Sequence, residues 1–279
     1  MSIMINDLPR TDDESAFVAC VENSVSRENL EDLVAGNVIA IRQQGYCLPK
    51  RCESIAASLL KHEMMDGYVV DPRIRRWGGR SGTFYDTYVD PSLLEEYFVN
   101  AQVVMQGLRE ACGFDSPIDR LHAELDEASP AGATVARFGK RKMVAGTARE
   151  FRVGVGADPH VDSLGFDSCR FPDAPKLDCQ LSANIYLQPA EDGGELEIWP
   201  QRITCTDTLE SLRDPSSDYG LDRKKLGAPA VRIKPEPGEL VLFDTNHPHA
   251  VCASKRGVRV TLSLFIGLVD WDSPLQLFN

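Results

Sequence analysis

The second half of the chain is a series of short β-rich segments, and this pattern restricts the possible folds more than any other feature. From Ala133 on, the segments are ATVARF, REFRVGV, CQLSANIYLQP, GELEIWP, AVRIK, GELVLF and VRVTLSLFIGL, and glycine or proline separates most of them. Short strands joined by such turns are typical of a β-sandwich or barrel and not of a parallel α/β sheet. We therefore expect a sandwich or barrel core in this half.

The first 115 residues are expected to be mainly helical. Residues 49–65 place apolar side chains at helical spacing behind a proline, which is a normal residue in a first helical turn. A second helix is expected over residues 91–112. Residues 75–90 contain three glycines and four aromatic residues without a helical period, and this predicts a functional loop. The polar residues 204–227 interrupt the strand series and are expected to form a lid over a site.

Composition excludes several classes of protein. The net charge of −12 over 279 residues argues against binding to nucleic acid or to an anionic membrane surface. No apolar run approaches the ~20 residues that span a bilayer, and the acidic N-terminal sequence MSIMINDLPRTDDE does not resemble a signal peptide. The eight cysteines form no CxxC pair, so we expect free thiols in a reduced, cytoplasmic protein. A homodimer remains open.

The first group of residues that could form a reactive or metal-binding site is His160-Val161-Asp162. Residues two apart on a strand point to the same face, so the imidazole and the carboxylate lie side by side and can bind one divalent cation. An HxD triplet alone is a weak signal, because a salt-bridged surface histidine gives the same pattern.

A second group strengthens this interpretation. The segment GELVLFDTNHPHAV ends a strand with two histidines, His247 and His249, and Arg259 follows ten residues after the second. Two histidines and one aspartate occupy one face of Fe(II) and leave three positions for a chelating cosubstrate and O2. An arginine one hairpin later can bind the distal carboxylate of 2-oxoglutarate. Either His247 or His249 could be the second histidine ligand.

The second half thus resembles the Fe(II)/2-oxoglutarate-dependent oxygenases. The resemblance covers about residues 133–268 and rests on HVD at 160–162, NIYLQPAEDGGELEIWP from Asn184, PEPGELVLFD, HAV at 249–251 and GVRVTLS, which occur in the family's order. It implies an α+β protein whose double-stranded β-helix, or jelly-roll, core spans residues 116–279. Residues 1–115 are then expected to pack on this core as part of a single integrated domain.

Within the family, the layout is most similar to small-molecule hydroxylases of N-succinyl amino acids and to aliphatic halogenases. The halogenases have glycine or alanine where the hydroxylases have the carboxylate, and this chain has Asp162. The resemblance therefore implies hydroxylation of an aliphatic C–H bond of an amino acid or N-acyl amino acid. Desaturation, epimerisation or cyclisation in natural-product biosynthesis is the alternative with the same cofactors, and a non-catalytic metal-binding sensor is a further one.

The resemblance also assigns candidate roles to residues around the metal. His160, Asp162 and His249 are the expected iron ligands. Arg259 is expected to bind 2-oxoglutarate with help from Thr261 on the same strand face, and Tyr186 has the position of a tyrosine that contacts this cosubstrate, although a core aromatic residue would fit equally. The candidate substrate residues are Arg80, Thr83, Arg152, Arg202 and Phe265.

Overall fold

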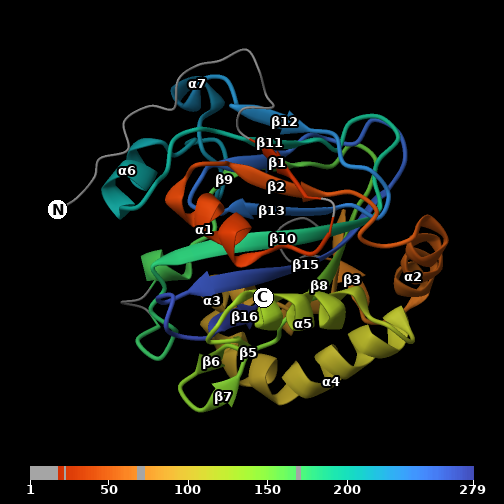
Figure 1. The fold of residues 1–279 in the computed structure, drawn as a ribbon. Helices are drawn as coiled ribbons and strands as arrows, with labels where there is room; N and C mark the ends of the chain where they lie inside the picture. The colour runs from red at the N-terminus through yellow and green to blue at the C-terminus, as the bar shows by residue number, and fades with distance from the viewer. Residues whose placement is uncertain (1–17, 22, 68–72, 168–170) are drawn as a thin grey trace.

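Two β-sheets face one another at the centre of the molecule (Figure 1). The computed structural model describes residues 18–21, 23–67, 73–167 and 171–279. Strands and turns alternate through the second half, as the glycine and proline spacing predicts, and the double-stranded β-helix fold is confirmed.

Ten strands form the larger sheet. In spatial order they are β1 (Val18–Cys20), β2 (Ala40–Gln43), β13 (Leu240–Asp244), β10 (Cys179–Gln188), β15 (Arg259–Leu268), β8 (Thr147–Phe151), β4 (Ile74–Trp77) and β3 (Met65–Gly67), while β16 (Leu275–Phe278) pairs with β15 and β5 (Ala133–Val135) with β16. The smaller sheet has the order β12 (Val231–Ile233), β11 (Leu196–Ile198), β14 (His249–Val251) and β9 (Ala157–His160). A separate ribbon joins β6 (Arg137–Phe138) to β7 (Arg141–Lys142).

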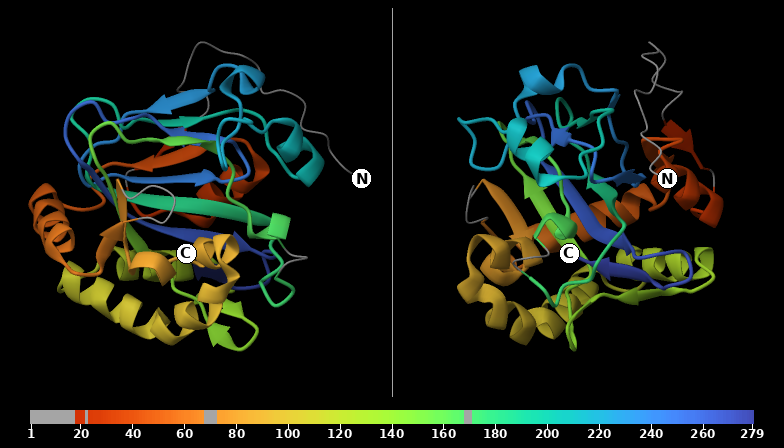
Figure 2. Two further views of the ribbon diagram at one scale, coloured as in Figure 1. Left: turned by 180° about the vertical axis from the view of Figure 1, so that it is seen from behind. Right: turned by 90° about the vertical axis from the view of Figure 1, so that its left-hand side faces the viewer.

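Helices cover the sheets from two sides. The α-helices are α1 (Arg27–Ala35), α2 (Pro49–Lys61), α3 (Phe84–Val89), α4 (Leu94–Cys112), α5 (Pro117–Ala128), α6 (Thr206–Ser211) and α7 (Arg223–Leu226), and the 3₁₀ turns are η2 (Gly79–Ser81), η3 (Pro91–Leu93) and η4 (Leu164–Asp167). Figure 2 shows α4 and α5 on one side of the sheets and α6 and α7 on the opposite side. None of the helices in the described ranges is long and apolar enough to cross a bilayer.

The central strands of the larger sheet are buried on both faces, but the two faces differ in polarity. On β15, Val260, Leu262, Leu264 and Ile266 belong to the main hydrophobic core, to which α2, α4 and α5 also contribute. The alternate residues Arg259, Thr261, Ser263 and Phe265 point to the other face, because strand side chains alternate. The space between the two sheets therefore has a polar wall on one side.

The sequence predicts the long helices well and the short elements less well. The expected helices at 49–65 and 91–112 are α2 and α4, with ends that differ by a few residues. The expectation of a loop over residues 75–90 is wrong, because they contain the end of β4 and the whole of α3. A capping box formed by Thr83 and Asp86 starts α3. The first 115 residues also supply β1 to β4, which the helical pattern does not reveal.

The turn before β13 joins the N-terminal part to the core. Gly238 has a φ of +80°, its N–H donates to the Tyr186 carbonyl at 2.7 Å, and its carbonyl accepts from the Cys47 N–H at 2.9 Å. A Cβ atom at this position would lie 1.9 Å from the Cys47 carbonyl oxygen. Only glycine satisfies both the left-handed backbone and this close approach.

We predict that Gly238→Ala destabilises the protein far more than Gly45→Ala. Gly45 has a φ of +66°, and a Cβ atom there would have no described neighbour within 4 Å, so its substitution adds only backbone strain of about 1–2 kcal/mol. Overlap with Cys47 should add about 1–3 kcal/mol at Gly238. Thermal unfolding of both variants measures the difference, and equal midpoints would contradict this account of the turn.

Candidate active site

Three side chains that could hold a metal ion meet at one end of the smaller sheet. His160 ends β9 and His249 begins β14, and the antiparallel pairing of these strands places the two residues opposite one another. Asp162 follows two residues after His160. Its Oδ2 lies 3.8 Å from Nε2 of His160 and 3.4 Å from Nε2 of His249, and the ligand atoms of the three residues lie within 4.8 Å of one another.

Backbone carbonyls orient both imidazoles for metal binding. Nδ1 of His160 lies 2.7 Å from the Asp158 carbonyl oxygen, and Nδ1 of His249 lies 3.0 Å from the His247 carbonyl oxygen. A carbonyl only accepts hydrogen bonds, so each Nδ1 carries a proton and Nε2 is the nitrogen of each ring that faces the centre of the triad. Such carbonyl contacts are the usual outer partners of metal-bound histidines.

The protonation states also suit a cation. Burial lowers the pKa of His160 to about 4, and the neighbouring His249 contributes to this shift. Burial alone would raise the pKa of Asp162, but interactions with His160 and His249 outweigh it and hold the pKa below its usual range. At neutral pH, His160 is therefore neutral and Asp162 ionised. The donor set fits a divalent transition metal with open coordination positions.

His247, the alternative ligand in the sequence, lies outside the triad. Its Nδ1 is 2.9 Å from the Trp199 carbonyl oxygen, and burial lowers its pKa. The turn that contains His247 contacts the triad through Thr245, whose hydroxyl donates to the Asp162 backbone carbonyl at 2.5 Å. The structure thus groups His249, and not His247, with His160 and Asp162.

A buried arginine lies in the same cavity as the triad. Arg259 is 4% exposed, and its guanidinium lies over the rings of Phe151 and Tyr186, 4.9 and 5.1 Å from their centroids. Its Nη2 lies 3.4 Å from the Tyr186 hydroxyl, while its buried Nε has no hydrogen-bond partner among the described residues. An unsatisfied buried donor is costly, and a carboxylate of a cosubstrate would satisfy it. Thr261, 1% exposed, faces the same cavity.

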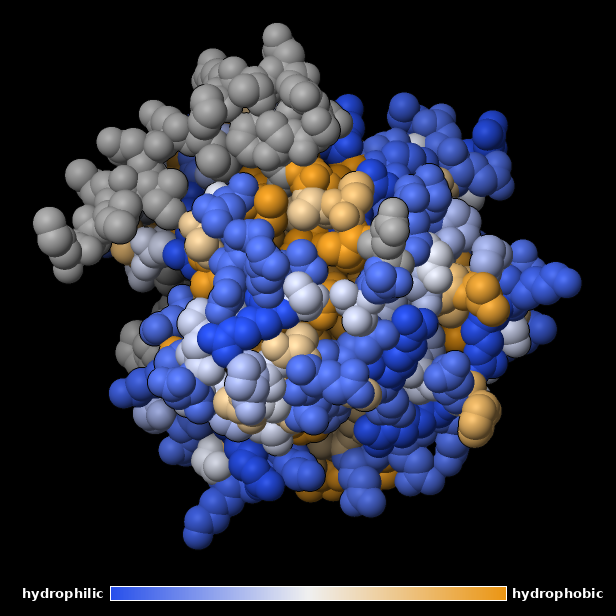
Figure 3. All heavy atoms as spheres, in the orientation of Figure 1, coloured by the Kyte–Doolittle hydropathy of each residue, from blue (hydrophilic) through white to orange (hydrophobic). Residues whose placement is uncertain are grey.

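The cavity has a volume of about 950 Å³ and is rich in arginine. Its lining includes six arginines and three aspartates: Arg73, Arg76, Arg149, Arg213, Arg223, Arg259, Asp158, Asp162 and Asp218. Three of these arginines pair with acids: Arg76 with Asp86, Arg213 with Glu210 and Arg223 with Glu197. Arginines therefore outnumber acids in the lining, although the chain has a net charge of −12, and this favours anionic ligands. The outer face in Figure 3 is mostly hydrophilic.

Of the candidate substrate residues, some line the cavity and others do not. Phe265 and Thr83 line the cavity, although the Thr83 hydroxyl also bonds Arg76 and Asp86. Arg152 and Arg202 do not belong to the lining, and their guanidinium groups pair with Glu150 and Asp244 at 3.2 and 2.6 Å. Arg80 lies in η2, and its side chain is outside the described part of the chain.

Several lining residues are not singled out by the sequence. Arg149 on β8 donates to the Ser263 hydroxyl at 3.0 Å, and its charge contributes to the lowered pKa values of His160 and Asp162. The alternation in TAREF places it opposite Thr261 on the cavity side, a signal that the sequence contains. Tyr219, in the polar 204–227 segment, contacts the His160 ring edge-on. No local sequence pattern predicts this contact.

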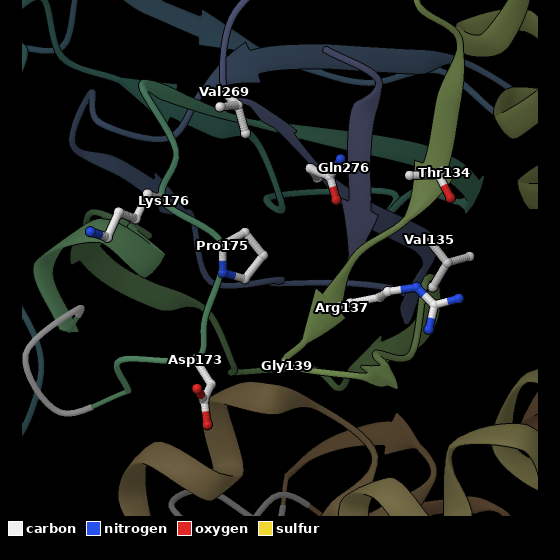
Figure 4. Close-up of a pocket in the computed structure, with 9 residues that line it drawn as sticks. All are labelled: Thr134, Val135, Arg137, Gly139, Asp173, Pro175, Lys176, Val269 and Gln276. Carbon is white, nitrogen blue, oxygen red and sulfur yellow. The ribbon is translucent and has the colours of Figure 1, made fainter.

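A second pocket, of about 530 Å³, is a surface hollow (Figure 4). Its described lining residues are all different from those of the triad cavity. Its two cationic side chains, Arg137 and Lys176, point to opposite sides in Figure 4 and do not converge on a common centre. The triad cavity is therefore the candidate active site.

Comparisons with known proteins agree with this geometry. Residues 147–267, which contain the triad and Arg259, match the 2OG-Fe(II) oxygenase superfamily. The chain is 26% identical over 269 residues to an L-gamma-glutamyl-L-propargylglycine hydroxylase of Streptantibioticus cattleyicolor, with 92% of this chain and 95% of that protein covered.

Solved structures show the same fold. An N-substituted L-amino acid dioxygenase from Burkholderia ambifaria superposes with a TM-score of 0.61 at 19% identity, over 91% of each chain. Its complex with alpha-KG gives the same score over 90% of each chain. The matched segment, the fold and the His-Asp-His triad lead to one conclusion: residues 147–267 are a 2OG-Fe(II) oxygenase segment, of a superfamily whose members use Fe(II) and 2-oxoglutarate.

Proposed function

We propose that the protein hydroxylates an aliphatic C–H bond of an anionic amino acid derivative, of the N-acyl or γ-glutamyl type. The observation that carries this proposal is the presence of the triad and of the partly unsatisfied, buried Arg259 in one cavity. The named activities of the similar hydroxylase and dioxygenase support the substrate class. The arginine-rich lining supports an anionic substrate.

In this proposal, His160, Asp162 and His249 hold Fe(II), and Arg259 binds the distal carboxylate of 2-oxoglutarate. Tyr186 and Thr261 complete that end of the cavity. Bound Fe(II), with 2-oxoglutarate and O2, supplies the oxidising chemistry that replaces an aliphatic C–H by C–OH. The protein contributes binding, orientation and exclusion of water. Since Asp162 occupies the carboxylate position, hydroxylation is favoured over halogenation.

The remaining lining orients the substrate. Phe265, Phe84 and Phe171 form an apolar part of the wall, whereas Arg149 on β8 and Thr261 on β15 form a polar part. Such a division suits a molecule with a hydrocarbon side chain and a carboxylate. Arg80, Arg152 and Arg202 stay sequence-based predictions of substrate residues, although Arg152 and Arg202 do not line this cavity.

The test is a substrate panel with Fe(II) and 2-oxoglutarate. Free amino acids, N-succinyl amino acids and γ-glutamyl dipeptides are compared by succinate release and product mass. We expect the acylated substrates to gain one oxygen atom and to release equimolar succinate. Loss of two hydrogens would indicate desaturation or cyclisation instead. An unchanged mass with succinate release would leave epimerisation or uncoupled turnover, and inactivity of metal-loaded protein on the whole panel would favour a sensor.

We predict that His249→Ala weakens Mn(II) binding by about 100-fold or more, because loss of a ligand exceeds the roughly 10–100-fold effect of losing an outer partner. The matched control is His247→Asn, which changes a buried histidine two residues away that lies outside the triad. Titration of free Mn(II) by electron paramagnetic resonance gives both dissociation constants. Retained affinity in His249→Ala with loss in His247→Asn would reverse the ligand assignment.

Arg259→Met should raise the KM for 2-oxoglutarate by about 10–100-fold, since a hydrogen bond to a charged group contributes about 1.5–3 kcal/mol. Arg256→Met is the control, because Arg256 lies on the same hairpin with a side chain that is 72% exposed and paired to Glu191. Steady-state succinate production measures both KM values. Equal KM values in the two variants would place the cosubstrate carboxylate elsewhere.

A further inference from the structure

The segment from α6 to α7, residues 206–226, lies directly on the strand that carries His160. Ser217 donates its hydroxyl hydrogen to the Asp158 carboxylate at 2.9 Å. The Leu221 N–H donates to the Pro159 carbonyl at 2.7 Å. The sequence predicts a lid in this region, and these contacts show that the segment is attached to β9 itself.

Tyr219 connects this segment to the metal ligand in two ways. Its hydroxyl oxygen accepts a hydrogen bond from the Asp158 N–H at 3.1 Å. Its ring lies edge-on to the imidazole of His160, with centroids 5.7 Å apart and planes at 82°. The Asp158 carbonyl in turn accepts the hydrogen of Nδ1 of His160 at 2.7 Å. Tyr219 therefore holds both the ring of His160 and the residue that orients that ring.

The segment itself is firmly anchored, so Tyr219 has a fixed position. Arg223 pairs with Glu197 of β11 at 2.6 Å, and its guanidinium lies 5.3 Å from the centroid of Trp199. Leu209, Leu221 and Leu226 pack with Trp199 in a separate buried cluster. Arg213 also donates to the Tyr219 carbonyl at 2.6 Å. These contacts tie the tyrosine to the smaller sheet, which also carries both histidines.

We propose that Tyr219 is a positioning residue for His160, and that the α6–α7 segment sets the metal affinity of the site through it. This inference rests on the proposed function, in which His160 is a metal ligand. Edge-on aromatic pairs contribute about 0.5–1.5 kcal/mol beyond their burial. Outer partners of metal-bound histidines change metal affinity by about 10–100-fold.

The experiment measures Mn(II) affinity in the full-length protein without any turnover. Tyr219→Leu removes the ring edge and the hydroxyl, and should raise the Mn(II) dissociation constant by about tenfold or more. Tyr219→Phe keeps the ring and should raise it less. Tyr88→Phe is the matched control, because Tyr88 lines the same cavity and contacts Tyr85 and Phe171. Its dissociation constant should stay within about twofold of the parent value.

Thermal unfolding of the metal-free proteins separates positioning from general destabilisation. If Tyr219→Leu does not fold, Tyr219→Phe and Ser217→Ala decide the question, because each removes one hydrogen bond to Asp158. Mn(II) affinity at the parent value in the folded Tyr219 variants would overturn the inference alone. A parent protein that does not bind Mn(II) would overturn the proposed function and the inference together.

Discussion

The pairing of β9 with β14 is the constraint on which the active site depends. It places His160 opposite His249, and because strand side chains alternate, a shift by one residue would turn one imidazole to the other face of the sheet. Asp162 has no such strand partner. Its N–H donates to the Thr245 carbonyl at 3.1 Å, so the turn after β13 holds the third ligand. The smaller sheet therefore positions the two histidines, and the turn after β13 of the larger sheet positions Asp162.

The polar face of the larger sheet is the second condition for function. Arg259, Thr261 and Ser263 on β15 are each at most 4% exposed, and burial of such groups is unfavourable unless they find partners. The protein itself supplies some of these partners, since Arg149 donates a hydrogen bond to the hydroxyl of Ser263. The Nε of Arg259 has no partner among the described residues, and in the proposed function the anionic cosubstrate supplies one. The opposite, apolar face of the same strand packs in the main core and stabilises this arrangement.

Sequence patterns predict those parts that depend on local periodicity. The spacing of two in HVD, the histidines after the 238–244 strand and the arginine on the next strand are short-range signals, as is the helical period of α2. Contacts that join distant segments leave no such signal. The pairing of β2 with β13 joins residues about 200 positions apart. The contact of Tyr219 with His160 depends on how the polar 204–227 segment packs against β9. The arginines show the same limit. Arg149 and Arg152 are close in the sequence, but Arg149 lines the cavity and donates to Ser263, whereas Arg152 pairs with Glu150 and does not line the cavity.

Local charge, and not the overall charge, governs which ligands this protein can bind. At physiological ionic strength the Debye length is about 8 Å, so exposed acids on the outer surface are largely screened from the cavity. Arg149 and Arg259 act at short range and within a partly buried space, where screening is weaker. Arg149 already favours the ionised form of Asp162 and the neutral form of His160. The same charge that prepares the donor set for a cation therefore also attracts an anion beside it, which is what a site for a metal and two carboxylate-bearing molecules requires.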